Sequence, residues 1–129
     1  MTPIRVGIVG AGGIVRDRHM PGLRAVDGVE IVAACNQTKE SGERFAREYG
    51  VANVCADWRE LVTSPDVDAV LIGAHPVTHC PVTVAALNAG KHVFCQARMA
   101  MNAREAKKML DVARGNPTLV TMLCPAPTG

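Results

Sequence analysis

The chain has 129 residues, of which 48% are hydrophobic and 3% aromatic, and its formal net charge is +2. This length suits one domain, whose core must be built from Ala, Val, Leu, Ile and Met rather than from aromatic side chains. The charged residues are scattered, without a basic stripe or interleaved aromatics, which argues against a nucleic-acid partner.

The N-terminal residues lack the charged and apolar regions of a signal peptide, and no apolar run approaches the length that spans a membrane. The sequence therefore predicts a cytoplasmic protein with no membrane partner. Its five cysteines are an odd number without a Cys-x-x-Cys pair, which favours buried free thiols.

The first predicted strand, residues 4–9, leads into a glycine-rich turn with the spacing Gly10-x-Gly12-x-x-Val15. Gly10 permits a tight turn after the strand. Gly12 lets the backbone come within hydrogen-bonding reach of a pyrophosphate, because neither glycine has a Cβ atom. Glycine-rich turns also occur in proteins that bind no phosphate, so the rest of the chain must be used to decide between these interpretations.

Strands and helices alternate along the rest of the chain. Apolar runs predict strands over residues 29–35, 51–55, 69–72, 92–95 and 119–123. Amphipathic patterns predict helices over residues 14–25, 39–49, 58–63 and 78–89, and a last helix between Asn102 and Gly115. This alternation predicts an α/β fold, a doubly wound parallel sheet of the Rossmann type with about six strands and helices on both faces.

Local signals predict where these helices begin and end. Gly50 ends the second helix, and Asp57 caps the third. Thr78 is the predicted N-cap of the fourth helix, with Pro81 tolerated in its first turn, while Pro21 predicts a kink or split in the first helix. Asn102 and Glu105 resemble a capping box for the last helix. The predicted apolar face of that helix consists of Ala103, Ala106, Leu110 and Ala113.

Ligands of a doubly wound sheet bind outside the carboxyl ends of the strands, where the strand order reverses. The segments that follow the predicted strands are therefore the candidates for a functional site. These segments are residues 10–14, 36–38, 73–78 and 96–99.

Three segments resemble the N-terminal half of the Gfo/Idh/MocA oxidoreductases. They are Gly-Ile-Val-Gly-Ala-Gly-Gly-Ile at residues 7–14 with His19 downstream, Leu-Ile-Gly-Ala-His-Pro-Val-Thr-His at residues 71–79, and Ala-Gly-Lys-His-Val-Phe-Cys at residues 89–95. The resemblance implies a Rossmann domain over residues 1–123 that binds NAD or NADP, and a tail at residues 124–129 where a C-terminal substrate domain would begin. It also implies hydride transfer to or from a sugar, polyol or related carbonyl compound.

The resemblance further implies where the cofactor binds. The implied cofactor-binding residues are Gly10, Gly12, Gly13 and Ile14 in the first turn, Asn36, Gln37 and Thr38 after the second strand, Ala74, His75, Pro76 and His79 around the start of the fourth helix, and Gln96. His79 also fits a structural role as a helix-start residue satisfied by the backbone. His75 and His79 lie four residues apart, but without a carboxylate nearby no metal site is expected.

The sequence departs from the family pattern after the fifth strand, where the Glu-Lys-Pro motif reads Gln96-Ala97-Arg98. Alanine cannot supply the lysine amine that assists proton transfer in the family. Arg98 can at most orient a carbonyl group or a phosphate, and a solvated surface charge is the alternative. The catalytic residues therefore stay unassigned.

A second departure follows the second strand. The sequence Asn36-Gln37-Thr38 offers neither the carboxylate that binds the ribose of NAD nor an arginine for the 2′-phosphate of NADP. Asn36 can bond a ribose or act as a turn residue, and Thr38 or Lys39 can meet a phosphate. The choice between NAD and NADP stays open.

Two hypotheses of function follow. In the first, the chain is the cofactor-binding domain of an NAD(P)-dependent oxidoreductase, inactive by itself because a C-terminal domain must hold the substrate near the nicotinamide. In the second, it is a non-catalytic Rossmann module that senses a nucleotide or mediates assembly. The apolar surface that a second domain would cover predicts a homo-oligomer.

Overall fold

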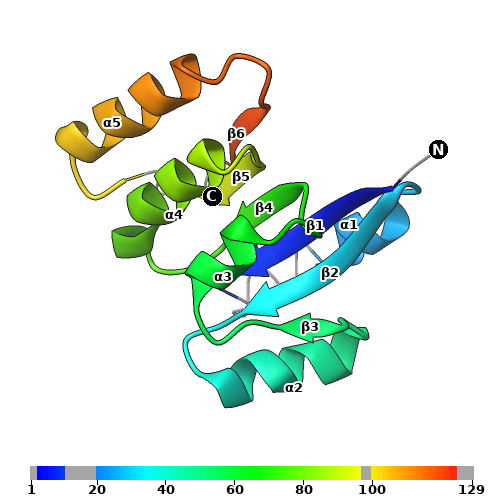
Figure 1. Cartoon of the computed structure of the whole chain (residues 1–129). Coiled ribbons are helices and arrows are strands. Elements are labelled where there is room, and N and C mark those ends of the chain that lie inside the picture. The colour runs from blue at the N-terminus through cyan, green and yellow to red at the C-terminus, as the bar shows by residue number, and fades with distance from the viewer. Residues whose placement is uncertain (1–2, 11–19, 97–99, 125–129) are drawn as a thin grey trace, which may run out of the picture.

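The computed structural model describes residues 3–10, 20–96 and 100–124, and these form one parallel sheet with helices on both faces (Figure 1). The strands are β1 (Ile4–Val9), β2 (Val29–Cys35), β3 (Asn53–Val54), β4 (Ala69–Ile72), β5 (His92–Gln96) and β6 (Thr121–Cys124). The helices are α1 (Met20–Ala25), α2 (Lys39–Tyr49), α3 (Trp58–Thr63), α4 (Pro76–Asn88) and α5 (Ala103–Arg114).

The strand order is β3-β2-β1-β4-β5-β6, and each neighbouring pair is parallel. The order reverses between β1 and β4, which lie side by side at the centre of the sheet. The predicted doubly wound parallel sheet is confirmed. No helix in the described ranges is long and apolar enough to cross a bilayer.

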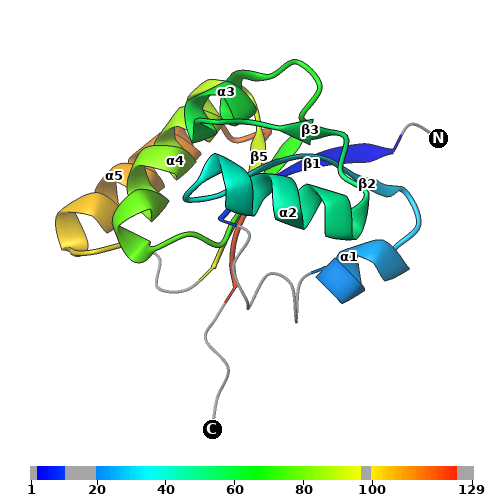
Figure 2. The same ribbon diagram turned by 90° about the horizontal axis from the view of Figure 1, so that it is seen from below.

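Helices α3, α4 and α5 lie on one face of the sheet and α1 and α2 on the other (Figure 2), and each face carries a separate apolar core. One face packs beneath α3, α4 and α5, and its core contains Val9, Leu61, Val62, Val70, Ile72, Val82, Ala86, Val93, Cys95 and Met109. The other face packs against α1 and α2, and its core contains Val6, Ile8, Met20, Ala34, Phe45, Ala46 and Leu71. Neighbouring strand residues enter opposite cores because successive side chains of a strand point to opposite faces. Small and branched aliphatic side chains supply most of both cores, as the composition predicted.

The predicted start of α4 is wrong. The helix begins at Pro76, with His75 at the N-cap position and no side-chain hydrogen bond to the cap. Thr78 lies inside the first turn, where its Oγ1 donates to the carbonyl of His75 at 2.7 Å. Proline suits the first helical position because its fixed φ is already helical and its missing N–H is not needed there. Pro81 consequently lies within the helix and not in its first turn.

The predicted apolar face of α5 is also partly wrong, because Leu110 is 45% exposed whereas Met109 is 4% exposed. Met109 enters the core shared with α4. Leu110 instead borders a shallow apolar hollow beside Met122 and Leu123 of the edge strand β6. The cap of α5 is as predicted, since Asn102 Oδ1 accepts from Glu105 N at 2.9 Å, but the Glu105 carboxylate bonds Met101 N rather than the cap itself.

Two strands begin later than the sequence predicts, and β5 extends one residue beyond its predicted end, to Gln96. Residue Val51 is buried, but its N–H bonds Ala46 O at the end of α2, so β3 is limited to Asn53–Val54. Leu119 N bonds Asn116 O in a turn, and β6 starts at Thr121. Residues 14–19 of the predicted first helix lie outside the described residues, and the described part, α1, begins at Met20.

An ion pair at the amino ends of β1 and β4 makes the stability of the fold depend on pH. Arg5 donates from Nε to Asp68 Oδ2 and from Nη2 to Asp68 Oδ1, both at 3.1 Å, and its backbone N–H bonds Oδ2 at 2.9 Å. These hydrogen bonds hold the pKa of Asp68 below its usual value. A carboxyl group whose pKa is lower in the folded than in the unfolded state stabilises the fold at pH values above its unfolded-state pKa. This stabilisation is lost as the pH falls through its folded-state pKa.

We therefore expect the urea midpoint of unfolding to fall as the pH is lowered from about 5 to about 2.5, with Asp68 contributing part of the fall. In Asp68→Asn the midpoint should be lower at neutral pH and should depend less on pH in this range. Asp66→Asn is the matched control, because the Asp66 carboxylate is 72% exposed and lies 3.8 Å from Arg5 Nη1. An equal flattening of the pH profile in both variants would contradict this assignment.

Candidate functional site

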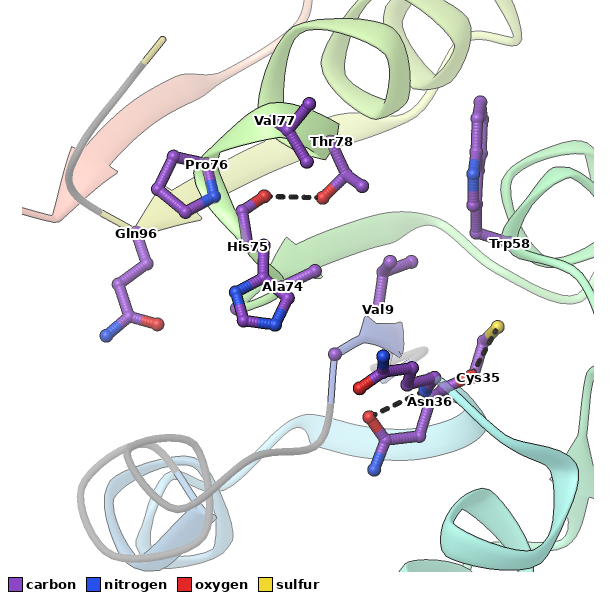
Figure 3. A pocket seen from close by; sticks show the side chains of 13 residues that line it. Val9, Cys35, Asn36, Trp58, Ala74, His75, Pro76, Val77, Thr78 and Gln96 are labelled. Atoms are coloured by element: carbon purple, nitrogen blue, oxygen red, sulfur yellow. Dashed lines mark hydrogen bonds between the residues drawn. The ribbon is translucent and has the colours of Figure 1, made fainter. Parts of the chain in front are cut away.

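A cavity of about 570 Å³ opens at the carboxyl ends of β1, β2, β4 and β5 (Figure 3). It spans the point where the strand order reverses, which is where ligands of doubly wound sheets bind. Its volume lies within the range of small-molecule sites. The cavity is lined by Val9, Gly10, Cys35, Asn36, Gln37, Trp58, Gly73, Ala74, His75, Pro76, Val77, Thr78 and Gln96.

The floor of the cavity joins the ends of three strands. Gly10 N donates to Cys35 O at 2.8 Å, and Gly73 N donates to Val9 O at 2.8 Å. Gly10 has φ +86°, which side-chain-bearing residues rarely adopt, and a Cβ there would collide with the backbone N and Cα of Ala74. The absence of a side chain at Gly10 therefore lets the loop after β4 lie directly against the end of β1.

The turn beyond Gly10 and the segment after Gln96 lie outside the described residues. The predicted pyrophosphate contacts of Gly12, Gly13 and Ile14 therefore stay predictions, as do the surroundings of Ala97 and Arg98. Gly10 and Gln96 are described, and both line the cavity.

Asn36 and Gln37 line the cavity at the end of β2, whereas Thr38 does not. Asn36 Oδ1 accepts a hydrogen bond from Gln37 N at 2.9 Å, which fixes the amide at the start of the loop. The Thr38 hydroxyl caps α2 by accepting from Ser41 N at 3.1 Å. Thr38 thus belongs to the helix cap and not to the cavity wall.

The loop between β4 and α4 contributes Ala74, His75 and Pro76 to the cavity. His79 lies behind this loop, 1% exposed and outside the cavity lining. Its Nε2 lies 2.8 Å from Ala74 O, and because a carbonyl oxygen only accepts, this nitrogen carries the proton. His79 therefore supports the backbone of the loop, in agreement with the structural role considered above, and it does not share a face with His75 for a metal. In the described part of the chain, no three His, Cys, Asp or Glu side chains are grouped to hold a metal ion.

The described lining is polar in places but carries no Asp, Glu, Lys or Arg side chain. Cys35 is buried, and this burial raises the pKa of its thiol to about 11, so the thiol is neutral at physiological pH. Cys55, Cys80 and Cys95 are also free thiols. The described wall therefore offers hydrogen bonds and apolar contact, but no carboxylate or amine for proton transfer.

Sequence reasoning missed Val9, Cys35 and Trp58 as lining residues, whereas Val77 lies in the candidate segment 73–78. Trp58 begins α3 immediately after its N-cap Asp57, and it follows β3 by a short loop. The rule used for the other strands, that residues after a strand face the ligand, also applies to β3. If this rule is applied to the residues that follow β3, Trp58 becomes a candidate lining residue.

The strand order, with a cavity at the point where it reverses, is that of the doubly wound α/β folds, the class to which dinucleotide-binding Rossmann domains belong. A family model described as "Oxidoreductase family, NAD-binding Rossmann fold" matches residues 4–123. The chain therefore belongs to the Gfo/Idh/MocA oxidoreductase family.

The chain is similar to several characterised relatives. It is 37% identical over 110 residues to a 1,5-anhydro-D-fructose reductase of Ensifer adhaerens, covering 85% of this chain and 33% of that protein. It is 36% identical over 115 residues to an inositol 2-dehydrogenase of Agrobacterium fabrum, covering 87% of this chain and 34% of that protein. The chain thus spans about a third of the length of these relatives.

Solved structures agree with this assignment. A myo-inositol 2-dehydrogenase from Lactobacillus plantarum superposes with a TM-score of 0.88 at 28% identity, covering 95% of this chain and 36% of that one. A 3-ketoreductase from Actinomadura kijaniata, in complex with NADP and TDP-benzene, superposes with a TM-score of 0.86 at 30% identity. The match covers 95% of this chain and 37% of that one.

Proposed function

We propose that the chain binds NAD or NADP in the cavity between β1 and β4, as the cofactor domain of an oxidoreductase that acts on a sugar, polyol or related carbonyl compound. The observation that carries the proposal is this cavity, which lies at the reversal of strand order and is built around Gly10. The family assignment and the names of the relatives support it.

The lining residues fit a dinucleotide. Asn36 and Gln37 present amides where the adenosine ribose of such a ligand lies, and the loop of Ala74, His75 and Pro76 forms the opposite wall. The nicotinamide, when bound, supplies or accepts hydride. The described lining supplies walls and hydrogen bonds around it, and the imidazole of His75 is the lining group of the type that most often transfers protons in enzymes.

We propose further that residues 1–123 form the cofactor domain and that the substrate requires a C-terminal domain beginning near residue 124. Cofactor binding without substrate turnover is then the expected behaviour of the 129-residue chain. Val120 and Met122 at the edge strand are 62% and 56% exposed, and this apolar edge supports the proposal that the chain self-associates.

We also propose that NAD and NADP bind with similar affinity. No carboxylate at the end of β2 repels a 2′-phosphate, and no arginine lines the described cavity to attract one. Titration of the chain with NADH and NADPH, followed by nicotinamide fluorescence and calorimetry, should give saturable binding of both, with dissociation constants within about tenfold of each other. Absence of binding of either dinucleotide at millimolar concentration would contradict the cofactor role.

A further inference from the structure

We propose that the indole of Trp58 is a stacking platform for a purine base, so that the adenine ring of a dinucleotide lies at the Trp58 end of the cavity and the nicotinamide half at the Gln96 end. This inference rests on the proposed function, because it specifies how the same cavity holds its ligand.

Trp58 is the only tryptophan of the chain, and among the described residues that line the cavity it is the only Phe, Tyr or Trp. In Figure 3 the indole stands edge-on at the end of the cavity opposite Gln96, so that a flat face rather than an edge is turned across the cavity. Trp58 is half-buried and packs partly against the core beneath α3 and α4, and the part of its ring that lines the cavity is a flat aromatic surface of the kind on which nucleobases stack.

The indole is held in place by a cation–π contact with Arg59. The guanidinium of Arg59 lies over the ring, 4.5 Å from its centroid, and Arg59 does not line the cavity. Arg59 Nη1 is in turn 3.2 Å from each carboxylate oxygen of Asp57, the residue that caps α3. This cation–π contact orients the indole, and because Arg59 is not among the lining residues, the part of the ring that lines the cavity is left for a ligand.

The residues near Trp58 in the cavity can bind the ribose to which a purine base is attached. Asn36 at the end of β2 provides an amide group next to Cys35, on the same side of the cavity as Trp58 (Figure 3), and the amide of Gln37, the next residue, also lines the cavity. Amides donate to and accept from ribose hydroxyls. A flat apolar face beside two amides matches a purine attached to a ribose better than it matches a nicotinamide, whose ring must remain accessible to a substrate. Gln96 and His75 line the other end of the cavity, at the ends of β5 and β4.

The single tryptophan allows a direct test with the unmodified chain. AMP, nicotinamide mononucleotide and oxidised NAD are titrated separately, with binding measured by calorimetry and the tryptophan emission recorded in parallel. We expect AMP and oxidised NAD to change the emission and nicotinamide mononucleotide to leave it unchanged. The oxidised form of NAD is used because reduced nicotinamide absorbs at the emission wavelengths of tryptophan and would quench it from a distance.

The variant Trp58→Leu should weaken the binding of AMP and NAD by about five- to one-hundred-fold, the usual loss when a base loses its aromatic partner, and leave nicotinamide mononucleotide unaffected. Trp58→Phe should show a smaller loss. Tyr49→Leu is the matched control, since Tyr49 packs on Phe45 of α2 and does not line the cavity. Circular dichroism verifies that each variant is folded, and the emission experiment on the unmodified chain stands even if Trp58→Leu does not fold.

The outcomes separate this inference from the proposed function. If NAD binds but neither AMP nor NAD changes the tryptophan emission, the stacking role is overturned while the cofactor role stands. An equal loss of AMP and nicotinamide mononucleotide affinity in folded Trp58→Leu would likewise overturn it. If no dinucleotide binds the unmodified chain, the proposed function itself fails.

Discussion

Gly10→Ala is expected to lower the free energy of unfolding by about 2–5 kcal/mol and to weaken dinucleotide binding in the molecules that remain folded. Two costs add at this position. The backbone φ of +86° is unfavourable for alanine, and the new Cβ would meet the backbone of Ala74. Relief of that collision requires the loop after β4 to move, and this loop forms one wall of the cavity.

Gly28→Ala is the matched control, because Gly28 also has φ +86° but no atom lies within 4 Å of its ideal Cβ position. It should cost only the backbone term, about 1–2 kcal/mol, and leave dinucleotide affinity unchanged. Urea unfolding of both variants, combined with calorimetric titration under conditions where each is folded, measures the two effects. Equal destabilisation at both positions would show that the loop of Ala74 does not depend on the glycine.

The helices whose bounds the sequence predicts correctly are those whose ends have a local cause. The second helix, α2, ends at Gly50 in the left-handed conformation, and α3 begins after Asp57, whose Oδ1 accepts from Arg59 N at 2.8 Å. The prediction of α4 was wrong because two start signals compete in its sequence, a threonine at 78 and a proline at 76. The proline is preferred there since β4 ends at Ile72 and the connecting loop is short.

The face of α5 could not be predicted from periodicity alone. The spacing of apolar residues shows which side of a helix faces the protein, but the neighbouring elements determine how many residues on that side are buried. Because β6 is the edge strand of the sheet, Leu110 lies over its rim and stays exposed, while Met109 reaches the core beneath α4.

The candidate site was predictable where backbone topology alone places a residue. The ends of parallel strands meet at one edge of the sheet, and seven predicted residues line the same cavity although they come from distant parts of the chain: Gly10, Asn36, Gln37, Ala74, His75, Pro76 and Gln96. Thr38 and His79 are close in sequence but turn away, because a helix cap and a loop carbonyl use their side chains. Such local hydrogen bonds depend on side-chain direction, which residue spacing does not specify.

Asn36→Asp is expected to make the chain select NAD over NADP by at least about tenfold. Asn36 lines the cavity at the end of β2, and aspartate has nearly the same shape, so the hydrogen bond from Gln37 N to the Oδ1 position should persist. A carboxylate there accepts a charge-assisted hydrogen bond from the 2′-hydroxyl of NAD and repels the 2′-phosphate of NADP. NAD affinity should therefore be equal or higher, and NADP affinity lower.

Calorimetric titration of both dinucleotides, at low and at high salt, tests this change. The selectivity should decrease at high salt, because screening weakens the repulsion between the carboxylate and the phosphate. Asn88→Asp adds the same charge at an exposed position at the carboxyl end of α4, away from the cavity, and should leave the ratio of affinities unchanged. If Asn36→Asp changes the affinities for NAD and NADP in parallel, the adenosine ribose does not lie at the end of β2, because a charge beside the 2′-position must distinguish a hydroxyl from a phosphate.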